Sequence, residues 1–462
     1  MAEEKKEQQQ EQFKEKVAAP DISAIKDPKQ YLEENLAPLE KFGGFDLIES
    51  TIEGTQKLNP AKKATKQIFL TESQFKNQRE NLKQTLIIWA DLLSKEGTIS
   101  SYVEECEKKA EVAAKSLKEN LKKAIGKTKD LERSYRSIAL FFNNTEQDKV
   151  KYVSIMNASP EQLKDLDNPR FINAVSEELN KHFDRLSLKN NYSLLVVPGY
   201  LGSKAVVDKW AKFAHKNKVL MITDFRNLED VESTVEMFEE ESLNGGDAHL
   251  SNVVMSCNWL VGRGKYEEIG EEEDLYVPPA SALAGKLYNT QATPISQGSA
   301  GKKYGTLNEV SGARFDLKKS EIAALNDLNL IPMVFEDNRV MAFSNKTLFN
   351  GNNIGLQEYP IVRVFDWIGK VFMNFFNDVA FQKFEKKLRD DIWEQIVDFL
   401  NDYKGVLFED YTFDRSGIKQ NPNTKDITIE INIKPFFAAK NFYIKLEGHD
   451  GKQGREWSTE VE

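Results

Sequence analysis

Two apolar runs separated by an amphipathic segment constrain the fold of this chain most. Residues 192–202, YSLLVVPGYLG, and 219–225, VLMITDF, are typical of buried strands, and residues 203–217 between them are typical of an amphipathic helix. The pattern predicts a β-α-β unit. A further strand is expected in 250–264, and a hairpin in 331–349 with its turn at Glu336-Asp337-Asn338.

These elements place a central α/β domain at residues 186–350, and the chain before it differs in character. Residues 1–20 form a charged tail with almost nothing apolar to bury, and 21–185 are expected to be a helical, partner-binding region. A capping box at Thr71–Gln74 predicts the start of one helix, which Gly97 ends.

A longer helix is predicted over residues 101–125, interrupted at Gly126, with another over 129–142. One side of the longer helix is apolar and the other is filled by Lys and Glu. A stripe of that length requires a cover, either from the rest of this chain or from a second chain.

The last region, residues 351–462, combines helices and strands. Large residues at helical spacing predict one or two amphipathic helices that end at Gly405. ITIEINI at 427–433 then alternates apolar and polar residues, and Pro435 separates it from a second strand-like run, NFYIKLE at 441–447. Residues 448–462 are expected to be a polar tail. The fold class predicted overall is mixed α+β and α/β.

The bulk properties exclude several classes of protein. The chain has 63 Lys and Arg against 73 Asp and Glu, and a formal charge of -10 disfavours a general nucleic-acid binder. Cys106 and Cys257 show no paired spacing, which suits a reducing compartment. No secretory h-region and no membrane-length apolar run is present, so a soluble, cytoplasmic protein without membrane insertion is expected.

A search for reaction chemistry finds one rival to a structural role. The turn from Gly199 to Lys204 lies between a strand and a helix, and Asp224 ends the next strand, as in some nucleotide sites. Its glycine spacing matches neither nucleotide fingerprint. QGSAGKKYG has Ser296 and Lys303 where a P-loop needs Gly and Ser or Thr.

Other chemistry-bearing residues are scattered or solvated. The four histidines show no ligand spacing, Gly262-Arg263-Gly264 lacks a third glycine, and the carboxylates of 267–274 are typical of a self-repelling loop. We therefore expect no enzyme activity, no catalytic residue, no cofactor and no metal.

The order of features in residues 250–447 resembles the large sheath subunit of type VI secretion systems, the TssC or VipB type, in its Bacteroidetes-like branch. The segments that carry the resemblance are VPPASALAGKL at 277–287, KKSEIAALNDLNLIPMVFEDNRVMAFSNKTLF at 318–349, YPIVRVFDWIGKVF at 359–372 and ITIEINIKPFFAAKNFYIKLEG at 427–448. The chain also resembles phage tail sheath proteins more distantly.

The resemblance implies a tail-sheath-like fold and a set of partners. It implies polymerisation with a small TssB/VipA-like subunit and with copies of itself around an inner Hcp-like tube, attachment to a baseplate, and recycling by a ClpV-like unfoldase. Contraction would drive effector delivery. Family members exchange strands between neighbours, and the residues expected here to form that interface are Ile427, Ile429, Ile431, Ile433, Phe442, Ile444 and Leu446.

Two alternatives stay open at this point. One is the sheath of a phage-like tail or extracellular injection particle, which shares the mechanism but lacks a small partner subunit. The other, from a different class, is an α/β nucleotide-binding enzyme that uses the Gly199 to Lys204 turn.

Overall fold

A computed structural model describes most of the chain. The described residues are 55–58, 63–94, 98–145, 150, 152–288, 294–440, 444–449 and 456–461. The predicted charged tail at 1–20 lies outside them. The chain forms two compact units, Met1–Asn120 and Leu121–Glu462, and each is considered by itself.

The first unit is helical where it is described. Its elements are η3 (Thr55–Leu58), α4 (Lys63–Thr71), η4 (Ser73–Phe75), α5 (Lys76–Ser94) and the first part of α6 (Ile99–Asn144). The predicted capping box is wrong, because Thr71 is the last residue of α4 and its hydroxyl donates to the Gln67 carbonyl at 2.7 Å. Helix α4 continues to this point because it buries Phe69 against Leu82 of α5.

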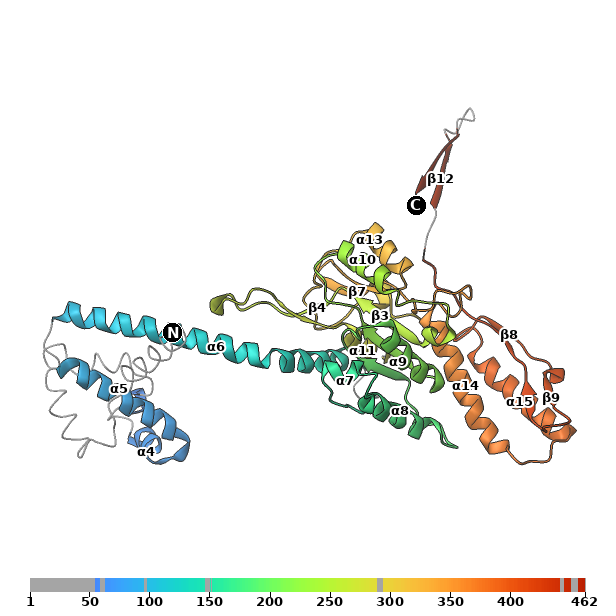
Figure 1. The fold of residues 1–462 in the computed structure, drawn as a ribbon, viewed down its shortest axis with the longest axis horizontal. Helices are drawn as coiled ribbons and strands as arrows, with labels where there is room; N and C mark the ends of the chain where they lie inside the picture. Colours follow the sequence, from blue (N-terminus) through green and yellow to red (C-terminus); the bar gives the residue numbers. More distant parts are fainter. Residues whose placement is uncertain are drawn as a thin grey trace. The chain divides into compact units, whose positions relative to one another are not determined.

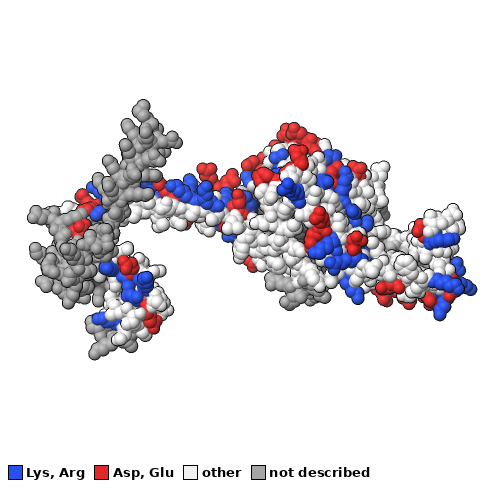
Figure 2. All heavy atoms as spheres, turned by 60° about the horizontal axis from the view of Figure 1, so that its bottom comes forward, with Lys and Arg blue, Asp and Glu red and all other residues white. Residues whose placement is uncertain are grey.

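Helix α6 runs through Gly126, where the sequence predicted an interruption. A glycine in a helix costs only about 1 kcal/mol relative to alanine, and the neighbouring Lys, Ala and Leu residues are strong helix formers. One continuous helix therefore replaces the two that were predicted. Figure 2 shows the charged side chains of α6 along one side and uncharged atoms along the other.

The predicted β-α-β unit is confirmed at the start of a five-stranded sheet (Figure 1). Strand β1 pairs in parallel with β2, and α9 connects them. The sheet has the order β1-β2-β3-β6-β7, parallel except at β7. Its members are β1 (Leu194–Val197), α9 (Lys204–Lys216), β2 (Leu220–Asp224), β3 (Val253–Cys257), β6 (Ile331–Glu336) and β7 (Arg339–Ala342).

Helices cover both faces of this sheet, as a parallel sheet requires. Met221 of β2 faces a core built with α8, α9, α10 and α13, whereas Ile222 faces α11 and the end of α6. The covering and connecting elements are α7 (Pro160–Lys164), α8 (Arg170–Phe183), α10 (Val231–Glu241), η6 (Ala248–Asn252), α11 (Ala280–Tyr288), α12 (Gly301–Tyr304) and α13 (Lys319–Asp327).

The single strand expected in 250–264 is two strands in different sheets. The chain turns at Asn258, whose φ is 64°, and β4 (Leu260–Arg263) pairs with β5 (Leu275–Val277) across a loop that contains η7 (Glu267–Ile269). The predicted hairpin is confirmed, with positive φ at Asp337 and Asn338 in its turn.

Two helices, α14 (Tyr359–Val379) and α15 (Lys386–Tyr403), open the last region, and Gly405 follows with a φ of 79°. Their apolar sides form a separate core. The remaining elements are β8 (Asp410–Thr412), η8 (Arg415–Gly417), β9 (Ile418–Gln420), β10 (Ile427–Ile429), β11 (Asn432–Lys434), β12 (Ile444–His449) and β13 (Glu456–Val461). Strand β13 replaces the polar tail that was predicted, since it pairs along its whole length with β12.

None of the helices in the described ranges combines the length and apolar character needed to cross a membrane.

Candidate assembly surface

Five of the seven residues predicted for strand exchange lie in three strands of the last region. Ile427 and Ile429 belong to β10, Ile433 belongs to β11, and Ile431 lies between them. Ile444 and Leu446 belong to β12, and Phe442 lies outside the described residues.

The ITIEINI segment is not one regular strand, and the reason lies in its partner. Strand β10 pairs with β9 and β11 pairs with β8, both antiparallel. The segment that pairs with ITIEINI is interrupted between β8 and β9 by η8, where the Gly417 N–H donates a hydrogen bond to the Asp414 carbonyl and closes a turn. The ladder therefore breaks into two pieces although residues 427–434 continue in one direction.

The alternation in this segment places one set of side chains against the C-terminal core. Ile429, Ile431 and Ile433 are partly buried and pack against the core cluster that contains residues of α14 and α15, whereas Thr428 and Glu430 are exposed. Ile427, at the outer end, keeps 42% of its surface exposed. A strand with one covered face and one open edge results.

The open edge follows from the hydrogen-bonding pattern. The Glu430 N–H donates to the Gly417 carbonyl at 3.1 Å, so residue 430 directs its backbone groups toward the β9 side. Along an antiparallel strand, the backbone N–H and C=O groups of successive residues point to opposite sides of the strand. Ile429, which lies opposite Ile418, therefore directs its N–H and C=O away from β9. No strand in the described part of the chain pairs there. An edge of this kind can accept a strand from another chain.

Strands β12 and β13 form a separate two-stranded ribbon with six residue pairs, from Ile444 opposite Val461 to His449 opposite Glu456. Neither strand pairs with another strand in the described ranges. Isolated two-stranded ribbons are marginally stable in water, so this ribbon also favours a further partner.

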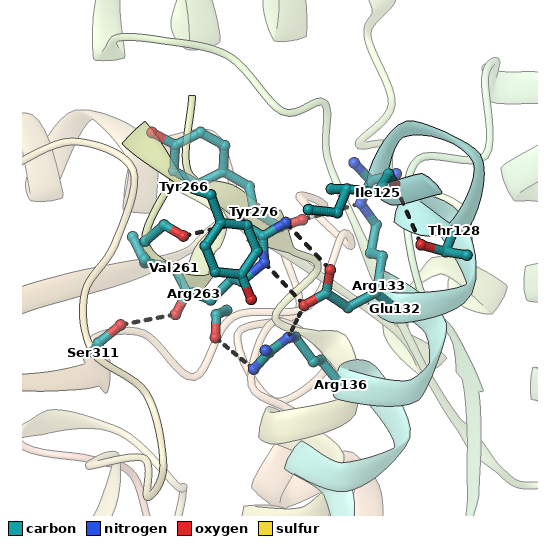
Figure 3. Close-up of polar contacts among 12 residues, drawn as sticks. Ile125, Thr128, Glu132, Arg133, Arg136, Val261, Arg263, Tyr266, Tyr276 and Ser311 are labelled. Atoms are coloured by element: carbon teal, nitrogen blue, oxygen red, sulfur yellow. Dashed lines mark hydrogen bonds and ion pairs between the residues drawn. The ribbon is translucent and has the colours of Figure 1, made fainter. Parts of the chain in front are cut away.

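A charged cluster fixes the β4–β5 hairpin to α6 (Figure 3). The Arg263 side chain, 8% exposed, contacts Glu132 of α6 at 3.0 Å and Glu271 of the hairpin loop at 2.6 Å. Arg136 contacts Glu132 at 2.9 Å and donates to the Gly262 carbonyl at 2.9 Å. The Arg133 guanidinium donates to the Tyr276 carbonyl at 3.0 Å.

Electrostatics in this cluster favour the ionised carboxylates. Hydrogen bonds from Arg263 are the main cause that lowers the pKa of Glu271. Burial raises the pKa of Glu132, but its bonds to Arg263 and Arg136 outweigh this and lower the pKa overall. Gly262 is required at the hairpin base because an added Cβ would lie 2.4 Å from Val277 Cγ2.

The turn from Gly199 to Lys204, which was the alternative nucleotide site, forms hydrogen bonds within the chain together with Asp224. Asp224 is fully buried and accepts hydrogen bonds from the Gly199 N–H, the Ala280 N–H and the Ser256 hydroxyl. Burial raises its pKa to about 7, against the lowering effect of these donors. The Lys204 ammonium donates to the Asn244 carbonyl at 3.3 Å. Asp224 thus joins three segments of the central unit.

Sequence reasoning missed the role of Arg263, which it weighed only as part of a glycine loop. The Glu132–Arg136 spacing of four residues is visible in the sequence, but Glu132 and Arg263 are too far apart in the chain for their contact to be read from it. In the part of the chain that the structure describes, no three His, Cys, Asp or Glu residues gather as a metal site requires.

Comparison with known proteins identifies family models along nearly the whole chain. Residues 123–350 match the central domain of the type VI secretion system TssC/VipB family, residues 32–121 match the TssC/VipB-like N-terminal region, and residues 358–462 match the TssC/VipB-like C-terminal domain. No curated protein matches the sequence.

Three solved structures show partial similarity to this chain. A chain of the anti-feeding prophage baseplate is 14% identical with a TM-score of 0.49, covering 68% of this chain and 80% of that one. A chain of the PVC sheath complex in the contracted state, from an extracellular contractile injection system, is 12% identical with a TM-score of 0.38. The match covers 62% of this chain and 70% of that one. A sheath tail protein of Desulfitobacterium hafniense is 13% identical with a TM-score of 0.35, and the match covers 64% of this chain and 59% of that one.

Proposed function

The chain belongs to the TssC/VipB family and is a contractile-sheath subunit of the type VI secretion kind; from this premise we propose that it polymerises with a small subunit around an inner tube and contracts to drive effector delivery. The proposal includes the expected domain boundaries after residues 20, 185 and 350, and it places the protein in the cytoplasm.

The observation that carries the proposal is the open edge at Ile429. An edge strand with outward N–H and C=O groups and a covered apolar face is the element that β-augmentation uses. A strand from a neighbouring subunit would extend β10, and the ribbon of β12 and β13 would provide further strands for exchange. Each added strand would satisfy backbone groups that otherwise remain exposed.

The exposed apolar side of α6 supports a small TssB/VipA-like partner. Val103 and Leu117 are 49% and 60% exposed on a helix whose other side is charged. Apolar residues repeated along an otherwise charged helix favour a covering helix from a second chain. We assign this surface to the small subunit.

Contraction in such an assembly requires no active site. Subunits assembled in one arrangement store free energy if a second arrangement of the same interfaces is more stable, and a trigger then releases it. The inner Hcp-like tube, the baseplate and a ClpV-like unfoldase complete the set of proposed partners, none of which is a nucleic acid.

The proposal is tested by co-expression with the small sheath subunit of the same gene cluster. We expect the two proteins to co-purify and to sediment together as tubular particles, whereas this chain alone does not assemble. Tubes formed by this chain alone would instead favour a phage-like or extracellular injection sheath. Saturable ATP or GTP binding abolished by Lys204→Ala would favour the nucleotide-binding enzyme.

A further inference from the structure

A basic cavity of about 350 Å³ lies beside α14 and the start of β1. Four of the residues that line it are basic and one is acidic: Lys189, Lys218, Arg363, Lys370 and Asp366. Lys218 lies 3.5 Å from Asp366, which also accepts a hydrogen bond from the Asn252 amide. The single carboxylate is therefore already engaged.

The two cavity cations on α14, Arg363 and Lys370, donate hydrogen bonds to backbone carbonyls. The Arg363 guanidinium donates to the Leu287 carbonyl at 3.1 Å, and the Lys370 ammonium donates to the Tyr192 carbonyl at 2.8 Å. Neither forms an ion pair within the described residues. Burial lowers the pKa of Arg363 to about 10 and that of Lys370 to about 8. Asp366, the carboxylate that attracts Lys370, also pairs with Lys218, so the positive charge of this partly buried cavity is incompletely neutralised. An anion that enters the cavity is therefore stabilised.

The same chain carries an acidic projection of matching charge. The loop between β4 and β5 contains six carboxylates within residues 267–274. Glu271 is engaged by Arg263, but Glu268 and Glu272 are exposed and form no ion pair with another described residue. The contacts of Arg263, Arg133 and Arg136 hold the base of the hairpin against α6, so its tip is pre-organised for docking.

The acidic loop points away from the cavity of its own chain. Figure 1 shows the loop beyond β4 extending away from the sheet on the side opposite to α14, which lines the cavity. A contact between two different patches on identical subunits is heterologous, and it propagates into a helical array unless rotation closes a ring. This geometry suits a polymer.

We propose that the basic cavity binds the acidic hairpin tip of a second copy of this chain, with Glu268 or Glu272 as the entering carboxylate. The inference rests on the proposed self-assembly and adds to it a lateral contact that is separate from the open edge of β10. Because both sides of the contact are charged, the contact is sensitive to ionic strength.

Disulfide trapping in the full-length chain tests this contact. Two variants are prepared in a Cys106→Ser background, Glu268→Cys and Lys189→Cys, both at exposed positions, and each is co-expressed with the small subunit. Mixing the two is expected to give a cross-linked dimer under mild oxidation. Adding Lys370→Met to the Lys189→Cys variant should lower the yield of cross-linked dimer by about threefold, because one ionic contact is lost. Glu239→Cys on α10, also exposed, replaces Glu268→Cys as the control.

Cross-linking no stronger than with the Glu239→Cys control, or cross-links formed within one variant alone, would overturn the inference. Its failure is distinguishable from that of the proposed function. Tubes without the specific cross-link would refute only the cavity contact, whereas the cross-link without tubes would support the contact and count against assembly into a sheath.

Discussion

At the scale of single residues, the sequence predicts which side chains face a core more readily than which polar groups meet. The alternation in 427–433 correctly placed Ile429, Ile431 and Ile433 on one covered face. Asp224 was instead weighed as part of a nucleotide site, and its acceptor role depends on Ala280, which is far along the chain. Contacts of this kind follow from the folded topology and have no local signal.

The raised pKa of Asp224 gives a prediction about pH. The group titrates near 4 when unfolded and at about 7 when folded, so between these values the folded state retains a proton that the unfolded state releases. This group's contribution to the free energy of unfolding is therefore present below pH 4 and is lost as the pH rises to 7, by an amount on the order of 2–4 kcal/mol.

Urea unfolding of the wild-type chain and Asp224→Asn at pH 5 and pH 8 measures this contribution. The variant is expected to be less stable at pH 5, because an amide has one acceptor fewer for the three donors, and to lose less stability between pH 5 and pH 8. Parallel losses in the two proteins would show that Asp224 does not titrate in this window.

At the scale of elements, the type of element was predictable and several boundaries were not. The β-α-β unit and the helices of the last region have strong periodic signals that tertiary packing reinforces. The break between β10 and β11 arises in the partner strand, at η8, and no feature of ITIEINI itself indicates it. At Gly126 the sequence predicted an interruption that the structure does not have, since a glycine that weakens a helix does not end it.

Two helical glycines are expected to respond oppositely to alanine. A Cβ at Gly126 would meet no atom within 4 Å, so Gly126→Ala should raise the free energy of unfolding by about 0.5–1 kcal/mol. A Cβ at Gly285 of α11 would lie 2.3 Å from the Phe141 carbonyl oxygen of α6, so Gly285→Ala should lower it by about 1–3 kcal/mol. Urea titrations followed by circular dichroism compare the two; equal shifts would contradict the helix packing described.

At the scale of the whole molecule, the order of regions carried the family resemblance, and the matches over 32–121, 123–350 and 358–462 confirm that family. The sequence of one chain does not specify what its open surfaces bind. The edge at Ile429 has no paired strand and one side of α6 is exposed and apolar within the described residues, and the proposed assembly would cover both.

The most direct test of this account is electron microscopy of Ile429→Pro co-expressed with the small subunit, beside Ile429→Val. Proline removes the outward N–H of β10 without removing the bond from Glu430 to Gly417, whereas valine keeps both. We predict tubes from the valine variant, and none from the proline variant although it still folds and co-purifies with its partner. Normal tubes from Ile429→Pro would contradict assembly through this edge.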